Sequence, residues 1–66
     1  MRLVVNGEQR EVEDVATVEE LLRAFKLENK ILVVELNLEI VERDAYGATP
    51  VKGGDRIEIV HFVGGG

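Results

Sequence analysis

The sequence contains no cysteine, no tryptophan, one histidine and one proline among its 66 residues. Without cysteine, the chain cannot form disulfides, thiolate nucleophiles or cysteine-ligated metal sites. A single histidine, His61, cannot by itself supply the ligand set of a zinc site. Cysteine-based catalysis and zinc-based catalysis are therefore excluded as activities that the chain performs alone.

Basic residues and long apolar runs are also scarce. Eight lysines and arginines stand against thirteen acidic residues, so the formal net charge is -5. A nucleic-acid-binding protein needs a basic surface, so nucleic acid is not an expected partner. No apolar run approaches the roughly 20 residues of a membrane-spanning helix, and the N-terminal segment is too polar for a signal peptide. We therefore expect a cytoplasmic protein without a membrane partner.

The short length limits what the chain can do on its own. A chain of 66 residues forms one domain and buries only about 60% of its unfolded surface. A deep catalytic pocket would use much of that small core, so a self-contained enzyme is not expected. We accordingly predict no catalytic residues and no bound metal or cofactor. The 45% apolar and 32% charged content is typical of a chain that folds.

Apolar periodicity and turn residues predict two strands, one helix and three further strands, in that order. The strands are expected at residues 3–5, 8–12, 31–35, 38–41 and 56–62, and the helix at residues 18–26. The Asn6-Gly7 pair favours a type I′ hairpin turn between the first two strands. A capping box begins the helix, in which the Thr17 hydroxyl accepts from the Glu20 amide and the Glu20 side chain reaches the Thr17 amide. Because the helix has one apolar stripe, it covers one sheet face and leaves the other open.

Three glycines stand at the end of the printed sequence. Glycine has no side chain to pack, so we expect a single domain over residues 1–63 and a flexible tail over residues 64–66. From the glycines alone, a frayed end or a remnant of an expression linker explains the tail equally well. In the functional explanation, Gly64 and Gly65 enter a partner's narrow active site and present the open carboxylate of Gly66.

Several stretches along the chain follow, in order and spacing, the pattern of one known family. They are Val5-Asn6-Gly7, Thr17 to Leu22, Asn37, Ile40-Val41, Arg43, Gly54 to Ile59, Val63 and Gly65-Gly66. On these residues the chain resembles the ThiS family, small ubiquitin-like sulfur carriers of thiamine biosynthesis. Two positions depart from the family pattern, since Gly64 stands where alanine is frequent and Tyr46 where tryptophan is common. Neither departure removes the reacting carboxylate.

The resemblance implies a fold and an activity. The fold is α+β, a β-grasp or ubiquitin-like arrangement, with a mixed five-stranded sheet and one helix packed on one face. The first and last strands of such a sheet lie parallel at its centre. An ATP-dependent activating enzyme would adenylate the Gly66 carboxylate, and persulfide sulfur from a donor such as a cysteine desulfurase would displace AMP. The product, a 1-thioglycine at Gly66, would deliver sulfur to thiazole synthase for the thiazole ring of thiamine.

The last strand is the expected docking surface for these partners. Side chains alternate along a strand, so Ile57 and Ile59 point to one face while Val60 and Phe62 point to the other. If the isoleucines face the helix, Val60 and Phe62 form an exposed apolar docking patch beside the glycines. The plain alternative is that Phe62 covers a sheet edge. Nearby glutamates either attract basic partner surfaces or only keep the chain soluble. We expect the isolated chain to be a monomer.

Two alternative functions stay open. A sulfur carrier of the same fold could serve molybdopterin synthesis, or the thiolation of an amino acid or tRNA. Molybdopterin-type chains are usually longer and proline-rich before the final glycines, whereas residues 61–63 read His-Phe-Val here. From a different class, a β-grasp interaction module without covalent chemistry would need no free glycine end.

Overall fold

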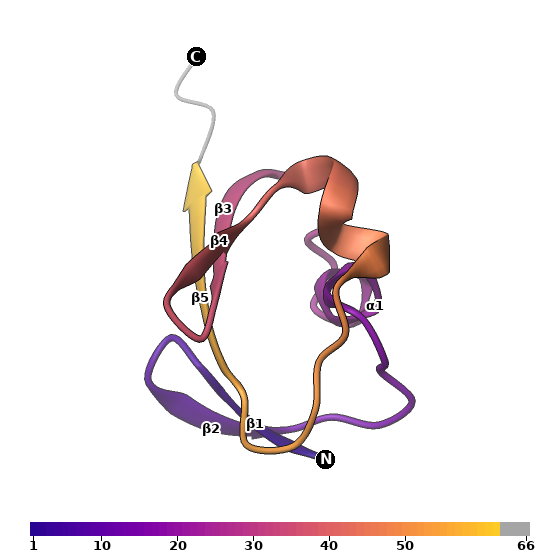
Figure 1. The fold of residues 1–66 in the computed structure, drawn as a ribbon, viewed down its shortest axis with the longest axis vertical. Helices are drawn as coiled ribbons and strands as arrows, with labels where there is room; N and C mark the ends of the chain where they lie inside the picture. The colour runs from indigo at the N-terminus through magenta and orange to yellow at the C-terminus, as the bar shows by residue number, and fades with distance from the viewer. Residues whose placement is uncertain (63–66) are drawn as a thin grey trace.

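The computed structural model describes residues 1–62, which form one five-stranded sheet with two helical segments on the same side (Figure 1). The elements are β1 (Arg2–Val5), β2 (Glu8–Glu11), α1 (Val18–Ala24), β3 (Ile31–Leu36), β4 (Glu39–Val41), the 3₁₀ helix η1 (Arg43–Ala48) and β5 (Arg56–Phe62). The predicted order of five strands and one helix is confirmed, and the bounds of the last strand agree with the prediction.

The sheet has the strand order β2-β1-β5-β3-β4, so the first and last strands are neighbours near its centre. β1 and β5 run parallel, with Val4 opposite Arg56, while the other three pairs of neighbours are antiparallel. This mixed sheet confirms the expected β-grasp arrangement. All four residues of β2 are polar or charged and exposed. Such a strand is suited to a sheet edge, because its side chains discourage pairing with other molecules.

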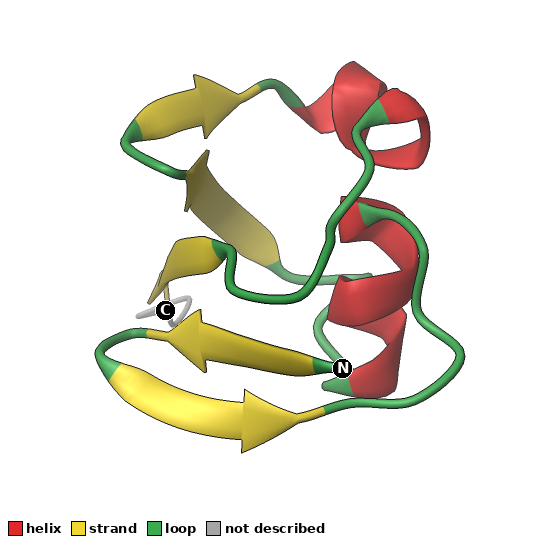
Figure 2. Cartoon of the chain, turned by 60° about the horizontal axis from the view of Figure 1, so that its bottom comes forward, coloured by secondary structure: helices red, strands yellow, loops and turns green. Residues whose placement is uncertain are grey.

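The core lies between the sheet and α1, which Figure 2 shows on the same side as η1. Its buried apolar residues are Leu3, Val5, Val12, Val15, Val18, Leu21, Leu22, Val34, Val51, Ile57 and Ile59. Each fully buried aliphatic side chain of this size stabilises the fold by about 1.5–3 kcal/mol. Ile57 and Ile59 therefore face the helix, and the predicted orientation of the last strand is confirmed.

The N-terminal cap of α1 differs in one contact from the predicted capping box. The Thr17 hydroxyl accepts from the Glu20 amide at 3.2 Å, as expected. The Glu20 carboxylate, however, accepts from the amide of Ala16 at 2.7 Å instead of the amide of Thr17. Thr17 itself is extended and forms an isolated bridge with Pro50.

Five predicted boundaries differ from the structure by one or two residues. Left-handed backbone explains two of them, the end of the helix and the start of the fourth strand. The helix ends at Ala24, because Lys26 has a φ of 61° and the chain turns there. Leu38, predicted to begin the fourth strand, lies in the turn before it with a φ of 74°, after Asn37 at 50°. The strand itself begins at Glu39.

Candidate functional site

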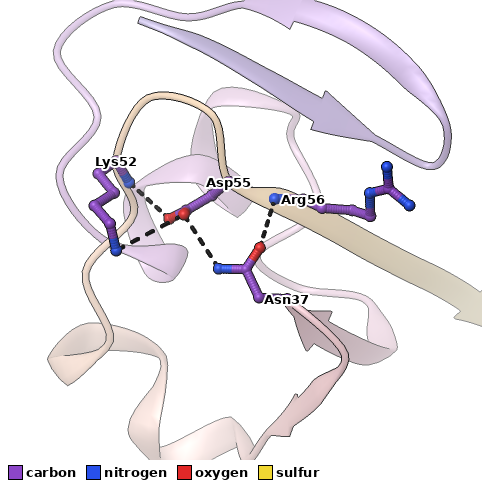
Figure 3. A network of polar contacts seen from close by, with 4 residues as sticks. All are labelled: Asn37, Lys52, Asp55 and Arg56. Atoms are coloured by element: carbon purple, nitrogen blue, oxygen red, sulfur yellow. Dashed lines mark hydrogen bonds and ion pairs between the residues drawn. The ribbon is translucent and has the colours of Figure 1, made fainter.

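Side chains from two turns fix the start of β5 (Figure 3). The Asp55 carboxylate, only 5% exposed, accepts from the Lys52 amide at 2.8 Å and from Asn37 Nδ2 at 3.1 Å. The Asn37 Oδ1 in turn accepts from the Arg56 amide at 3.0 Å, and Lys52 Nζ lies 3.9 Å from Asp55 Oδ1. A buried carboxylate with this many donors is structural, so Asp55 orients the strand instead of serving as an acid or base.

The later part of β5 is held from the other side by the first hairpin turn. The last residue pair between β1 and β5 is Val5 with Ile57. Beyond it, the Asn6 amide donates to the Ile57 carbonyl at 2.9 Å, and the Asn6 side chain bonds the backbone of Ile59. The turn thereby extends the ladder past the end of β1 and fixes which way the next residues of β5 face.

An apolar surface lies on the sheet face opposite α1. Val60 and Phe62, each 53% exposed, point there, where the sequence predicted them. In the antiparallel register of β3 and β5, Val33 lies opposite Val60 and Ile31 opposite Phe62. Ile40 of β4 is also exposed on this face. We call these five residues the open-face patch, and the docking role of Val60 and Phe62 stays a prediction.

Sequence reasoning missed three members of the open-face patch, namely Ile31, Val33 and Ile40. A signal for the first two was present, because residues 31–34 are apolar without interruption. An uninterrupted apolar strand is typical of a sheet that is covered on both faces. Since the sequence predicts a single covering helix, one half of this run has to face outward.

Gly64, Gly65 and Gly66, predicted to enter a partner's active site, lie outside the described residues, as does Val63. The strand that leads to them is described, and β5 ends at Phe62, far from the N-terminus (Figure 1). The predicted docking residues Val60 and Phe62 are therefore the last exposed apolar side chains that the structure describes before the glycines.

Residues 1–62 show neither a metal-binding cluster nor a membrane-spanning helix. No group of three or more histidine, aspartate or glutamate side chains is placed there to hold a metal ion. None of the helices described is long and apolar enough to cross a membrane. A hollow of about 430 Å³ between α1, η1 and β3 contains Glu19 and Arg23, which pair with each other at 3.8 Å.

Comparisons with known proteins agree with this geometry. The ThiS family model matches residues 3–66. Sulfur carrier protein ThiS of Bacillus subtilis is 49% identical over 53 residues, which are 80% of each chain. A crystal structure of a thiamine biosynthesis protein (ThiS) from Geobacter metallireducens is 45% identical, covers both chains fully and has a TM-score of 0.84. A thiazole synthase of Paramagnetospirillum magneticum is 46% identical over 66 residues, and the chain spans only 20% of its length. The chain belongs to the ThiS family.

Proposed function

We propose that this chain is a sulfur carrier for thiamine biosynthesis and that the carboxylate of Gly66 carries the sulfur. Family membership supports the pathway. The observation that carries the proposal is the open-face patch, an exposed apolar surface whose member Phe62 stands four positions before Gly66. A partner that docks on this surface has the chain end within reach of its own active site.

The chemistry starts from a poor electrophile, because a carboxylate is negatively charged and stabilised by resonance. An oxygen of the Gly66 carboxylate attacks the α-phosphorus of ATP, pyrophosphate leaves, and an acyl-adenylate forms. A persulfide then attacks the acyl carbon and displaces AMP, which gives an acyl disulfide. A further thiol attacks the sulfur–sulfur bond, so that a disulfide leaves with the donor and a thiocarboxylate remains on Gly66.

The partner enzymes supply the catalytic groups in this scheme. The activating enzyme binds ATP and stabilises the charge that develops at phosphorus and at the acyl carbon. The sulfur donor, such as a cysteine desulfurase, provides the persulfide. This chain contributes the reacting carboxylate and the surface by which each partner positions it, so it is a co-substrate and not an enzyme. All these partners use soluble metabolites, so we place the reaction in the cytoplasm.

Thiazole synthase is the proposed acceptor of the sulfur. The support is that a thiazole synthase of Paramagnetospirillum magneticum contains a stretch that matches this whole chain within one longer polypeptide. A carrier domain and an enzyme that are joined in one chain stay at high effective concentration, which is useful when one hands a group to the other. For a carrier that is not joined to the enzyme, the open-face patch would supply that proximity.

Intact-mass measurement tests the proposal. Incubation with the cognate activating enzyme, ATP and a persulfide donor should raise the mass by the difference between sulfur and oxygen, and fragmentation should place the gain on Gly66. Purified thiazole synthase with its other substrates should then return the carrier to its original mass. A thiolated carrier that loses sulfur only to a molybdopterin-forming or tRNA-thiolating enzyme would assign it to another pathway. If the mass does not change at all, the carrier function is rejected and the chain is better described as a non-covalent binding module.

A further inference from the structure

The turn between β3 and β4 contains a residue that is unfavourable for its conformation. Asn37 and Leu38 have φ values of 50° and 74°. A left-handed conformation is disfavoured for a bulky residue, whose Cβ approaches the backbone. Packing does not compensate, because Leu38 is 80% exposed.

The chain itself provides a comparison for this turn. The turn between β1 and β2 has Asn6 and Gly7 in the matching positions, with φ values of 51° and 83°. Glycine is the residue that such a turn favours in its second position. The chain therefore has the favourable residue in one hairpin and an exposed leucine in the equivalent place of the other. Within residues 1–62, Leu38 is not part of the core and is not packed against it.

A second unfavourable arrangement lies on the open face of the sheet. Glu35 of β3 is directly opposite Glu58 of β5, and both side chains are half-buried. Like charges in directly opposite positions destabilise a sheet. Within residues 1–62, neither glutamate forms an ion pair. The repulsion is therefore not relieved by a cation of the described chain.

The two unfavourable features meet at Ile40. Glu35 lies directly opposite Ile40 in the pairing of β3 with β4, and Leu38 stands two residues before it. Ile40 itself is 65% exposed. Natural sequences are locally consistent with their fold except where function requires otherwise. The left-handed leucine and the like-charge pair both destabilise the free chain next to one exposed isoleucine. Together they indicate a binding surface.

We propose that Leu38, Ile40 and the Glu35–Glu58 pair form a second docking site, which we call the hairpin site. Its partner is a protein surface with an apolar hollow for two aliphatic side chains and a lysine or arginine that lies between the two glutamates. A cation there would remove the repulsion that the free chain retains, and complementary charge would also speed the encounter. The proposal rests on the proposed function only in that its enzymes are the partners to be tested.

The hairpin site shares Ile40 with the open-face patch but lies toward the opposite end of the sheet from Phe62. In the register of the sheet, Leu36 lies opposite Ile57 and Ile31 lies opposite Phe62. The Leu36 end of β3 is therefore about 17 Å from the Phe62 end of β5, at roughly 3.3 Å per residue. A partner bound to the hairpin site contacts the body of the carrier, while the end of β5 points into the partner's active site.

The first test replaces Leu38 by glycine. Leu38→Gly should raise the Tm by about 4 °C, because a strained residue is removed from a turn that favours glycine. It should also raise the Kd for the activating enzyme or for thiazole synthase by about tenfold, measured by calorimetric titration. Leu38→Asn serves as a second variant, since asparagine tolerates the left-handed conformation without the flexibility of glycine. Unchanged affinity of both variants for both enzymes would overturn the proposal, as would a lower Tm of both.

The second test reverses the charge of Glu35. Glu35→Lys should raise the Tm, because the like-charge pair with Glu58 becomes an opposite-charge pair. It should weaken partner binding by about tenfold and flatten the dependence of the Kd on salt. Glu13→Lys is the matched control, because it makes the same change of charge in an exposed residue on the helix side. Equal effects of the two variants on binding would show that only net charge matters, and the hairpin site would be rejected.

Two further outcomes separate this proposal from its alternatives. Sedimentation of the wild-type chain and of Leu38→Gly tests whether a second copy occupies the hairpin site. If the wild-type chain forms a dimer and Leu38→Gly dissociates it, the site mediates self-association and the proposal is overturned. If wild-type chain binds the enzymes but is never thiolated, the proposed function fails, while the titrations with Leu38 variants still decide the docking site.

Discussion

The side-chain amide of Asn6 hydrogen-bonds both backbone groups of Ile59. Its Oδ1 accepts from the Ile59 N–H at 2.7 Å, and its Nδ2 donates to the Ile59 carbonyl at 3.1 Å. One side chain thus replaces a strand residue at the point where β1 has ended. Because the peptide groups on either side of Ile59 are fixed, Val60 and Phe62 are directed to the open face.

Replacement of Asn6 by glycine should destabilise the fold without strain in the turn. Glycine keeps the left-handed backbone of this position, where φ is 51°, but leaves both groups of Ile59 without their partner. Loss of such part-buried hydrogen bonds costs about 1–3 kcal/mol of the free energy of unfolding. Urea denaturation measures the change, and an unchanged midpoint would show that the Asn6 side chain is not needed to hold β5. Asn6→Ala should cost more, because alanine adds the strain of a Cβ atom.

Replacement of Asp55 by alanine should be similarly damaging, for a different reason. The substitution removes the acceptor of the Lys52 amide and of Asn37 Nδ2 in a place that is almost fully buried. An unsatisfied buried donor costs about 1–3 kcal/mol, so the free energy of unfolding should fall by at least about 2 kcal/mol. Asp44→Ala in the exposed first turn of η1 is the matched control and should change it by less than about 0.5 kcal/mol. Comparable losses in both variants would contradict a structural role for Asp55.

Local patterns were sufficient to predict much of this fold. The Asn6-Gly7 turn follows from the chemistry of left-handed residues, and the orientation of β5 follows from the alternation of Ile57 and Ile59 with exposed neighbours. The same alternation correctly predicted that Val60 and Phe62 are exposed. These features depend on residues that are adjacent in sequence, so a single sequence contains the information needed.

The features that sequence reasoning missed depend on distant residues or on backbone that propensity does not encode. The bonds of Asn6 cross 53 positions to Ile59, and the burial of Asp55 depends on Asn37, which lies 18 positions away. Leu38 is a poor residue for a left-handed turn, so its propensity predicted strand instead. The opposition of Glu35 and Glu58 follows from strand register, which becomes known only when β3 is placed beside β5.

Replacement of Phe62 by aspartate tests the open-face patch as a docking surface. The side chain is 53% exposed, so the fold should survive with a nearly unchanged Tm. If Phe62 is a docking residue, binding to the activating enzyme should weaken by about 2 kcal/mol or more, roughly thirtyfold in Kd. His61→Asp places the same charge on the neighbouring residue, which points to the opposite face of β5, and should bind far better. Equal binding of the two variants in a calorimetric titration would count against the patch.

Deletion of Gly65 and Gly66 should separate folding from function. The buried apolar residues extend from Leu3 to Ile59, and glycine has no side chain to add to them. The free energy of unfolding should therefore change by less than about 0.5 kcal/mol in urea denaturation. The shortened chain should still bind the activating enzyme through the open-face patch, yet it should show neither the mass gain of a thiocarboxylate nor carrier-dependent exchange of pyrophosphate into ATP. A tryptophan added after Gly66 should have the same effect, because it displaces the reacting carboxylate and is too large for a narrow active site. Activation of the extended chain at the rate of the unmodified one would show that Gly66 is not the reacting residue, and a large loss of stability on deletion would give the glycines a structural role.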